Sequence, residues 1–249
     1  MKNIIFKFLF LTISLNFFFN NIKTYSNTNK KLIEKVKIEN FYNSEINELR
    51  IEKNNIQNIL KILKRYDYQN APKKKIVNGQ ITYTYKRSEN EQKKTVKELE
   101  TLINNPEKTE RYEKFITKTI SYLLFSGVRI YIKEIKRDIS AEWIYKNQNI
   151  IFNEKSLKEG TKNFAYLLSH EVIHIAQSCK GGYLNSYPVL LNLNLAKPKS
   201  YYYRRLKSSA YKNLKKNEVL LEIEAYANEE NLLQTLNLFK YFCLKNNVD

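Results

Sequence analysis

The feature that most constrains this chain is a pair of histidines, His170 and His174, with Glu171 directly after the first. Residues four apart on a helix lie on one face about a turn from each other, so both imidazoles can aim a nitrogen at one metal ion. Two neutral imidazoles and a third protein ligand leave one position on tetrahedral zinc open for water, and a neighbouring carboxylate can take that water's proton. The spacing therefore predicts a zinc site at His170 and His174, with Glu171 as general base.

The surrounding residues predict that this site lies on a core helix. Thr161 is the expected N-cap, and Gly181 and Gly182 follow where the helix should stop. Five apolar residues would hold the helix in the core: Phe164, Leu167, Leu168, Ile175 and Ala176. The alternative is a core helix whose two histidines are satisfied by hydrogen bonds without a metal. The chain has only these two histidines, which favours the metal site.

The third ligand has to come from downstream. A second helix is expected from Asn217 to about Leu244, after a long connector at residues 183–216. It carries five glutamates, Glu218, Glu222, Glu224, Glu229 and Glu230. Residues two apart on a helix are separated by about 200°, so Glu222 and Glu224 cannot both face the histidines. If Glu222 faces them, Glu218, Val219, Ala225 and Tyr226 share its side.

A resemblance favours Glu224. The motif at 170–174, followed by Gln177 and by Glu224-Ala-Tyr-Ala227, resembles the zincins, which are zinc metallopeptidases with a glutamate ligand on a second helix. Residues 143–228 also resemble poorly characterised H-E-x-x-H proteins of cyanobacteria and plastids. The resemblance implies hydrolysis of peptide bonds by a metal-activated water, with Glu224 as the third zinc ligand.

Two details of that resemblance stay open. Glutamate-ligand zincins commonly carry an acid one turn after the ligand, to orient a histidine ring, and this chain has Asn228 there. With Glu224 facing the metal, Ala227 would let the two helices approach, and Asn228 could accept the ring N–H. The residue that stabilises the oxyanion is not fixed, and the candidates are Tyr187, Tyr201, Tyr202, Tyr203 and Tyr226.

The order of elements predicts an α+β fold. A strand is expected at 128–135, and then a hairpin with strands at 141–145 and 150–153 leads into the metal-site helix. The zincin resemblance implies a small antiparallel or mixed sheet against the active-site helix and a C-terminal ligand helix. It also implies that 141–145 or 150–153 pairs with an extended substrate.

The N-terminal part reads as a mostly helical extension. A helix is expected from near Ser44, with an apolar face that includes Ile46 and Leu49. A turn-rich connection at 67–80 and a short strand at 81–86 follow. Helices are then expected around 96–103 and from Pro106 to Gly127. The expected division is a leader at 1–26, the extension at 27–105 and a zincin-like peptidase domain at 106–249.

The leader and the charge bear on location and partners. Lys2 precedes and Lys7 interrupts a short apolar run, which is typical of a signal peptide and of export to a periplasm, thylakoid lumen or extracellular space. The alternative is a membrane anchor through residues 4–19. The formal net charge is +18, but lysine outnumbers arginine 35 to 8 and is spread through every segment. Most lysines are therefore read as solvated, and the expected partner is a protein or peptide substrate instead of nucleic acid.

Two other functions stay open. One is a zinc-containing binding or assembly module that hydrolyses nothing, and the other is an intracellular protease that works at nucleic acid. The oligomeric state is left open. Cys179 and Cys243 are the only cysteines, and they are either two buried thiols or, in an oxidising compartment, a disulfide that ties the metal-site helix to the C-terminal helix.

Overall fold

The computed structural model describes residues 48–87, 92–136, 139–195, 197, 199–207 and 211–244. The expected leader and Ile46 lie outside these ranges. Within them, no helix has the length and apolar character needed to cross a membrane.

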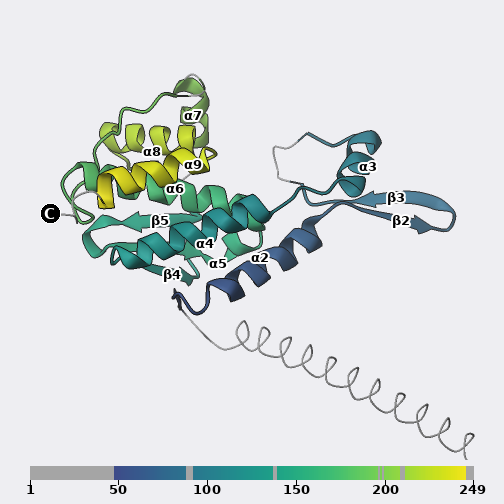
Figure 1. Cartoon of the computed structure of the whole chain (residues 1–249). Helices are drawn as coiled ribbons and strands as arrows, with labels where there is room; N and C mark the ends of the chain where they lie inside the picture. Colours follow the sequence, from purple (N-terminus) through teal and green to yellow (C-terminus); the bar gives the residue numbers. More distant parts are fainter. Residues whose placement is uncertain are drawn as a thin grey trace, which may run out of the picture. The chain divides into compact units, whose positions relative to one another are not determined.

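A mixed four-stranded sheet forms one layer of the fold (Figure 1). Its strands, in spatial order, are β1 (Leu49–Ile51), β4 (Arg129–Lys133), β6 (Asn149–Asn153) and β5 (Ala141–Ile144). The β4–β6 pair is parallel and the other two pairs are antiparallel. β6 has neighbours on both sides, whereas β5 is an edge strand. Of the two strands expected to pair with a substrate, only β5 therefore has an edge to offer.

Helix α6 (Thr161–Lys180) is the centre of the fold. Every residue from Leu168 to Cys179 is buried. The helix packs on strand β5 and on helices from both ends of the chain. These are α2 (Ile56–Asn70), α4 (Glu110–Phe125), α5 (Glu154–Leu157), α8 (Lys216–Asn228), α9 (Leu232–Phe239) and the π-helical turn η3 (Lys240–Leu244). The fold is α+β, as the sequence predicts.

The remaining elements are peripheral to α6. Strands β2 (Lys73–Val77) and β3 (Gln80–Thr84) form a hairpin whose turn residues, Asn78 and Gly79, both have positive φ. Helix α3 (Val96–Asn104) begins with a capping box between Thr95 and Glu98. A 3-10 turn, η1 (Tyr145–Asn147), joins β5 to β6, and helix α7 (Lys199–Arg205) lies within the long connector.

The N-terminal expectations need correction. The segment expected to be helical from Ser44 instead contributes β1, and α2 begins only at Ile56. Asn55 explains the turn between them, because its side chain accepts the Glu52 N–H and donates to the Arg50 carbonyl. Since β1 pairs with β4 and α2 packs on α6, the expected boundary at 105/106 does not separate two units.

Further expected boundaries also shift. The connection expected at 67–80 contains the end of α2 and all of β2, and α4 starts at Glu110 instead of Pro106. The single C-terminal helix is interrupted between Asn228 and Leu232. There Asn231 caps α9 by accepting the Gln234 N–H.

A disulfide joins Cys179 at the end of α6 to Cys243 in η3, with a Cα–Cα distance of 5.2 Å. Of the two alternatives for these cysteines, the structure shows the disulfide. The bond closes a chain segment that contains α7, α8 and α9, so it fixes the C-terminal helices against α6.

Candidate metal centre

The start of α6 is fixed by a carboxylate from α2. Asp67 accepts hydrogen bonds from the Thr161 backbone N–H and hydroxyl. Thr161, the expected N-cap, is thus the first helical residue. The N-cap is the preceding residue, Gly160, with φ +85°. A Cβ on Gly160 would collide with the Asp67 carboxylate that the Thr161 hydrogen bonds hold in place, so both backbone conformation and space favour glycine here.

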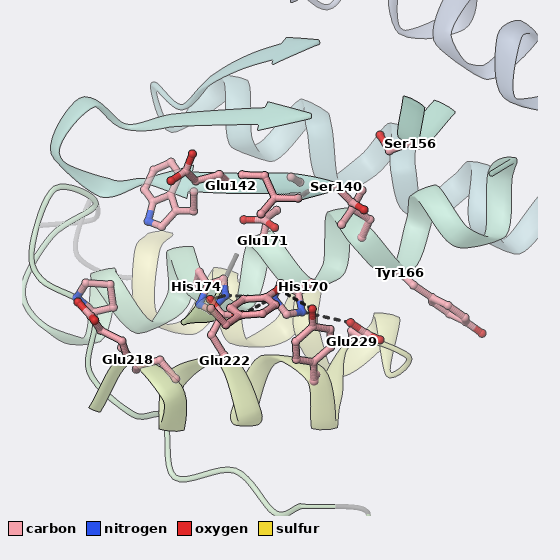
Figure 2. Close-up of a pocket in the computed structure, with 18 of the residues that line it drawn as sticks. Ser140, Glu142, Ser156, Tyr166, His170, Glu171, His174, Glu218, Glu222 and Glu229 are labelled. Atoms are coloured by element: carbon pink, nitrogen blue, oxygen red, sulfur yellow. Dashed lines mark hydrogen bonds and ion pairs between the residues drawn. The ribbon is translucent and has the colours of Figure 1, made fainter. Parts of the chain in front are cut away.

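Three side-chain donors converge at the middle of α6 (Figure 2). His170 Nε2 and His174 Nε2 are 3.1 Å apart. The two Glu222 oxygens lie 3.3 Å from His170 Nε2 and 3.4 Å from His174 Nε2. One ligand atom from each of the three side chains lies within 4.8 Å of the other two. Imidazole nitrogens and carboxylate oxygens are common ligands of zinc, so this group could hold a metal ion such as zinc.

The other nitrogen of each imidazole is held by an acceptor. His170 Nδ1 lies 3.1 Å from Glu229 Oε2, and His174 Nδ1 lies 2.8 Å from Gln177 Oε1. An acceptor at Nδ1 favours the tautomer whose proton is on Nδ1, and this leaves the Nε2 lone pair for a metal. Both rings are thus oriented toward the space beside Glu222.

Glu171 lies in the same cleft as the histidines, with 3% of its surface exposed. Its Oε2 atom makes no hydrogen bond with the described residues. Burial raises the pKa of this carboxyl group, although the neighbouring imidazoles His170 and His174 oppose the shift. A buried carboxylate oxygen without a partner is suited to hold the proton of a water molecule.

The charges of the three donors stabilise one another in the protein without a metal. Burial by itself lowers the pKa of His170, but hydrogen bonds with Glu222 and Glu229 outweigh burial, and the net pKa is well above its usual value. Burial also lowers the pKa of His174, but the charge of Glu222, its hydrogen bond and the charge of Glu171 together outweigh burial, and the net pKa is raised. Burial opposes ionisation of Glu222, yet the two imidazoles hold its pKa far below the ordinary value.

The structure does not bring the expected third ligand, Glu224, to the histidines, and Glu222 lies there instead. Glu224 points to the opposite side of α8, where its carboxylate accepts the N–H groups of Leu191 and Leu193 at 2.8 and 2.9 Å. It also accepts from Gln177 Nε2 at 2.9 Å. Glu224 is thus bound by the connector before α8. Because Glu222 and Glu224 are separated by about 200° around the helix, Glu222 faces the histidines.

The neighbours of the two glutamates agree with this correction. Asn228 donates to the backbone carbonyl of Glu224, and Glu229 is the residue at hydrogen-bond distance from His170 Nδ1. The small residue between the helices is Ala225, which packs with Ile173 of α6, while Ala227 belongs to another cluster. The sequence did offer a signal for Glu229, because it lies seven residues, or about two turns, after Glu222.

The candidate oxyanion tyrosines fall in different places. Tyr187, Tyr201 and Tyr226 line the cleft, whereas Tyr202 is buried in an apolar cluster and Tyr203 is not among the lining residues. The Tyr226 ring lies 4.5 Å from the His170 ring, between centroids, and its hydroxyl is 2.6 Å from that of Tyr211. Burial is the largest cause of a strongly raised Tyr211 pKa. Nothing in the sequence singled out Tyr211.

A cleft of about 1060 Å³ surrounds this centre. Strand β5 lines one wall and α8 lines another (Figure 2). Trp143 fixes β5 against α6 by donating its indole N–H to Ser178 at 3.0 Å. The edge of the sheet is thereby held beside the three donors.

Comparisons with protein-family models, with curated proteins and with solved structures find no match to this chain.

Proposed function

We propose that this chain is a zinc-dependent peptidase. The observation that carries the proposal is the grouping of ligand atoms from His170, His174 and Glu222 within 4.8 Å of one another, with the unpartnered carboxylate oxygen of Glu171 in the same cleft. The resemblance of the H-E-x-x-H motif and its downstream glutamate to zincins supports the same function.

The residues of the cleft have separate roles in the proposed reaction. His170, His174 and Glu222 would hold zinc, which when bound acts as a Lewis acid on a carbonyl and lowers the pKa of a water molecule to about 7. Glu171 accepts the proton of the attacking water and returns it to the leaving amine. Its raised pKa, caused by burial, helps it hold that proton between the two steps. Glu229 and Gln177 keep the imidazoles in the orientation that the ligands need.

Strand β5 is the proposed binding edge for an extended substrate. Its residues Ala141 to Trp143 line the cleft, and one side of the strand has no partner within the described sheet. Main-chain hydrogen bonds along such an edge bind a peptide largely independently of its side chains. The disulfide also supports the proposed export, because disulfides persist in oxidising compartments.

The test combines metal analysis with digestion of an unstructured protein, with and without a chelator. We expect one zinc per chain and hydrolysis that the chelator abolishes. Glu171→Gln should retain zinc, because the residue is not a ligand, and should lose turnover by about 100-fold or more. Zinc at one per chain without hydrolysis would instead favour a non-hydrolytic zinc-binding module.

A further inference from the structure

We infer that the β2–β3 hairpin docks on an anionic phospholipid bilayer by inserting its apolar end. The inference goes beyond the proposed peptidase function and does not depend on it. Every residue from Lys74 to Thr82 is exposed. Three large apolar side chains lie next to the turn, Ile76, Val77 and Ile81, and 73%, 51% and 54% of their surfaces are exposed. Adjacent exposed apolar side chains that are bordered by charged residues mark an interaction site.

The apolar side chains lie on both faces of the hairpin. Ile76 and Ile81 are cross-strand partners, so they share one face. Val77 follows Ile76 in the same strand and points to the opposite face. A protein partner that docks on one face would leave the other face exposed, whereas the interface of a bilayer surrounds both. The turn residues Asn78 and Gly79 are polar, so insertion stays shallow, at the boundary between headgroups and acyl chains.

The residues behind the apolar end are basic. Segment 73–87 contains no acidic residue and five basic ones, Lys73, Lys74, Lys75, Lys86 and Arg87. Two of these are in ion pairs, since Lys74 Nζ lies 3.2 Å from Glu100 and Lys86 Nζ lies 2.8 Å from Glu159. The basic side chains thus outnumber the two carboxylates that pair with them. The excess extends to the end of α3, because residues 73–104 include eight basic and four acidic residues.

The lysines of β2 lie close enough to the apolar end to meet lipid headgroups. A strand rises about 3.3 Å per residue, so Lys73 and Lys75 lie within about 10 Å of Ile76 along the strand. This distance is comparable with the Debye length of about 8 Å at physiological ionic strength. Lys73 Nζ also lies 5.0 Å from the ring centroid of the exposed Tyr68, and tyrosine is enriched at membrane interfaces. Both kinds of contact favour an anionic bilayer surface.

Other occupants fit only part of this surface. A second copy of the chain would bring the lysines of two hairpins together, and lysines along β2 oppose pairing with a further strand. Nucleic acid would match the charge, but it offers no apolar medium around Ile76 and Ile81. An anionic bilayer offers both a negative surface and an apolar boundary.

The experiment places an environment-sensitive fluorophore on the hairpin of the full chain through Gln80→Cys, because the two native cysteines are joined in the disulfide. Vesicles of phosphatidylcholine mixed with phosphatidylglycerol should raise its fluorescence. Vesicles of phosphatidylcholine alone at the same lipid concentration should not. The same fluorophore at Glu134→Cys, an exposed position after β4, should not respond. This local readout separates insertion of the hairpin from attachment through the N-terminal apolar run.

Substitutions in the hairpin test both parts of the surface, with affinity measured as the lipid concentration at half-maximal change. Ile76→Thr/Ile81→Thr keeps the β-branched shape that strands favour and should raise that concentration about tenfold or more. Val77→Thr is nearly isosteric and keeps the hairpin intact, and it should raise the concentration about threefold. Lys73→Gln/Lys75→Gln should raise it about fivefold for each charge removed.

Matched controls remove the same chemistry elsewhere. Leu233→Gln removes an apolar side chain of α9 that is 72% exposed, and Lys114→Gln/Lys118→Gln removes two exposed charges from α4. Both should stay within about twofold of the wild type, because charges beyond the Debye length are screened. No fluorescence change on the mixed vesicles, or equal effects of the controls and the hairpin variants, would overturn the inference. An effect of the lysine variant without any effect of the isoleucine variant would indicate binding to polyanions such as nucleic acid and would overturn docking on a bilayer.

Discussion

Helices α6 and α8 both supply donors to the proposed metal centre, but they differ in how their faces are used. Helix α6 is buried all round over its central turns, and its two donors stand one turn apart on one face. Helix α8 is buried on more than one face, since Leu221 and Ile223 are both buried, and it carries Glu222 and Glu224 on opposite faces. On α6 the spacing of the histidines is enough to identify the donors. On α8 the hydrogen-bond partners of each carboxylate determine which glutamate faces the histidines.

The difference shows what a buried carboxylate requires. Glu222 is satisfied by two imidazoles, and Glu224 is satisfied by two backbone N–H groups of the connector and by Gln177. Burying an ionised group without such partners costs several kcal/mol, so each face of α8 must meet a different set of donors. The predictions below test this division, from the largest expected effect to the smallest.

The sharpest test compares Glu222→Ala with Glu224→Ala. Glu222→Ala removes a metal donor, so zinc affinity should fall by more than the roughly 10- to 100-fold that is typical of outer partners. Glu224→Ala should lower zinc affinity much less, because Glu224 reaches His174 only through Gln177. Competition with a chromophoric chelator measures both values. A larger zinc loss in Glu224→Ala would reverse the assignment of faces.

The order of these two variants should be reversed for stability: Glu224→Ala should lower the free energy of unfolding more than Glu222→Ala does. Glu224→Ala leaves the Leu191 and Leu193 N–H groups without an acceptor, so the free energy of unfolding should fall by about 2 to 5 kcal/mol. Urea denaturation of the metal-free protein gives this value. Equal stability of Glu224→Ala and the wild type would show that the connector does not depend on this carboxylate.

The disulfide fixes the end of α6, and no such bond is seen within the described part of α8. Reduction should lower the free energy of unfolding by about 2 to 4 kcal/mol, because the unfolded chain gains freedom when the closed segment opens. Denaturation with and without a thiol reductant measures the change. The Cys179→Ser/Cys243→Ser variant is the control, and its stability should not respond to the reductant.

Glu229→Gln tests whether the end of α8 orients the first histidine. Glutamine keeps the shape and an acceptor oxygen for His170 Nδ1 but removes the charge, so zinc affinity should fall about 10-fold and not more than about 100-fold. Glu230→Gln is the matched control, because Glu230 is the next residue and is exposed. An identical zinc affinity in Glu229→Gln and wild type would remove the orienting role.

The raised pKa of His170 predicts how zinc binding depends on pH. The imidazole without a metal keeps its proton to a pH above the usual value near 6.5, and zinc must displace that proton. Apparent zinc affinity should therefore fall as pH is lowered through the raised pKa, about tenfold per pH unit for each proton displaced. Chelator competition between about pH 6 and pH 9 checks this. A flat affinity over that interval would contradict the raised pKa.

The sequence by itself determined the α+β class, the hairpin before α6 and the placement of His170, Glu171 and His174 on one buried helix. These features depend on local periodicity, and a spacing of four residues has one geometric meaning on a helix. The pairing of the only two cysteines was one of two alternatives that composition allowed.

Only the tertiary structure decided which glutamate joins the histidines. Local pattern could not place Leu49–Ile51 in a strand, because that strand exists through pairing with β4, far along the chain. It also could not foresee that Leu191 and Leu193 would bind Glu224, since those N–H groups lie more than thirty residues away in sequence. The face of α8 that meets the metal centre is fixed by these distant hydrogen bonds, and helical periodicity fits either face equally well.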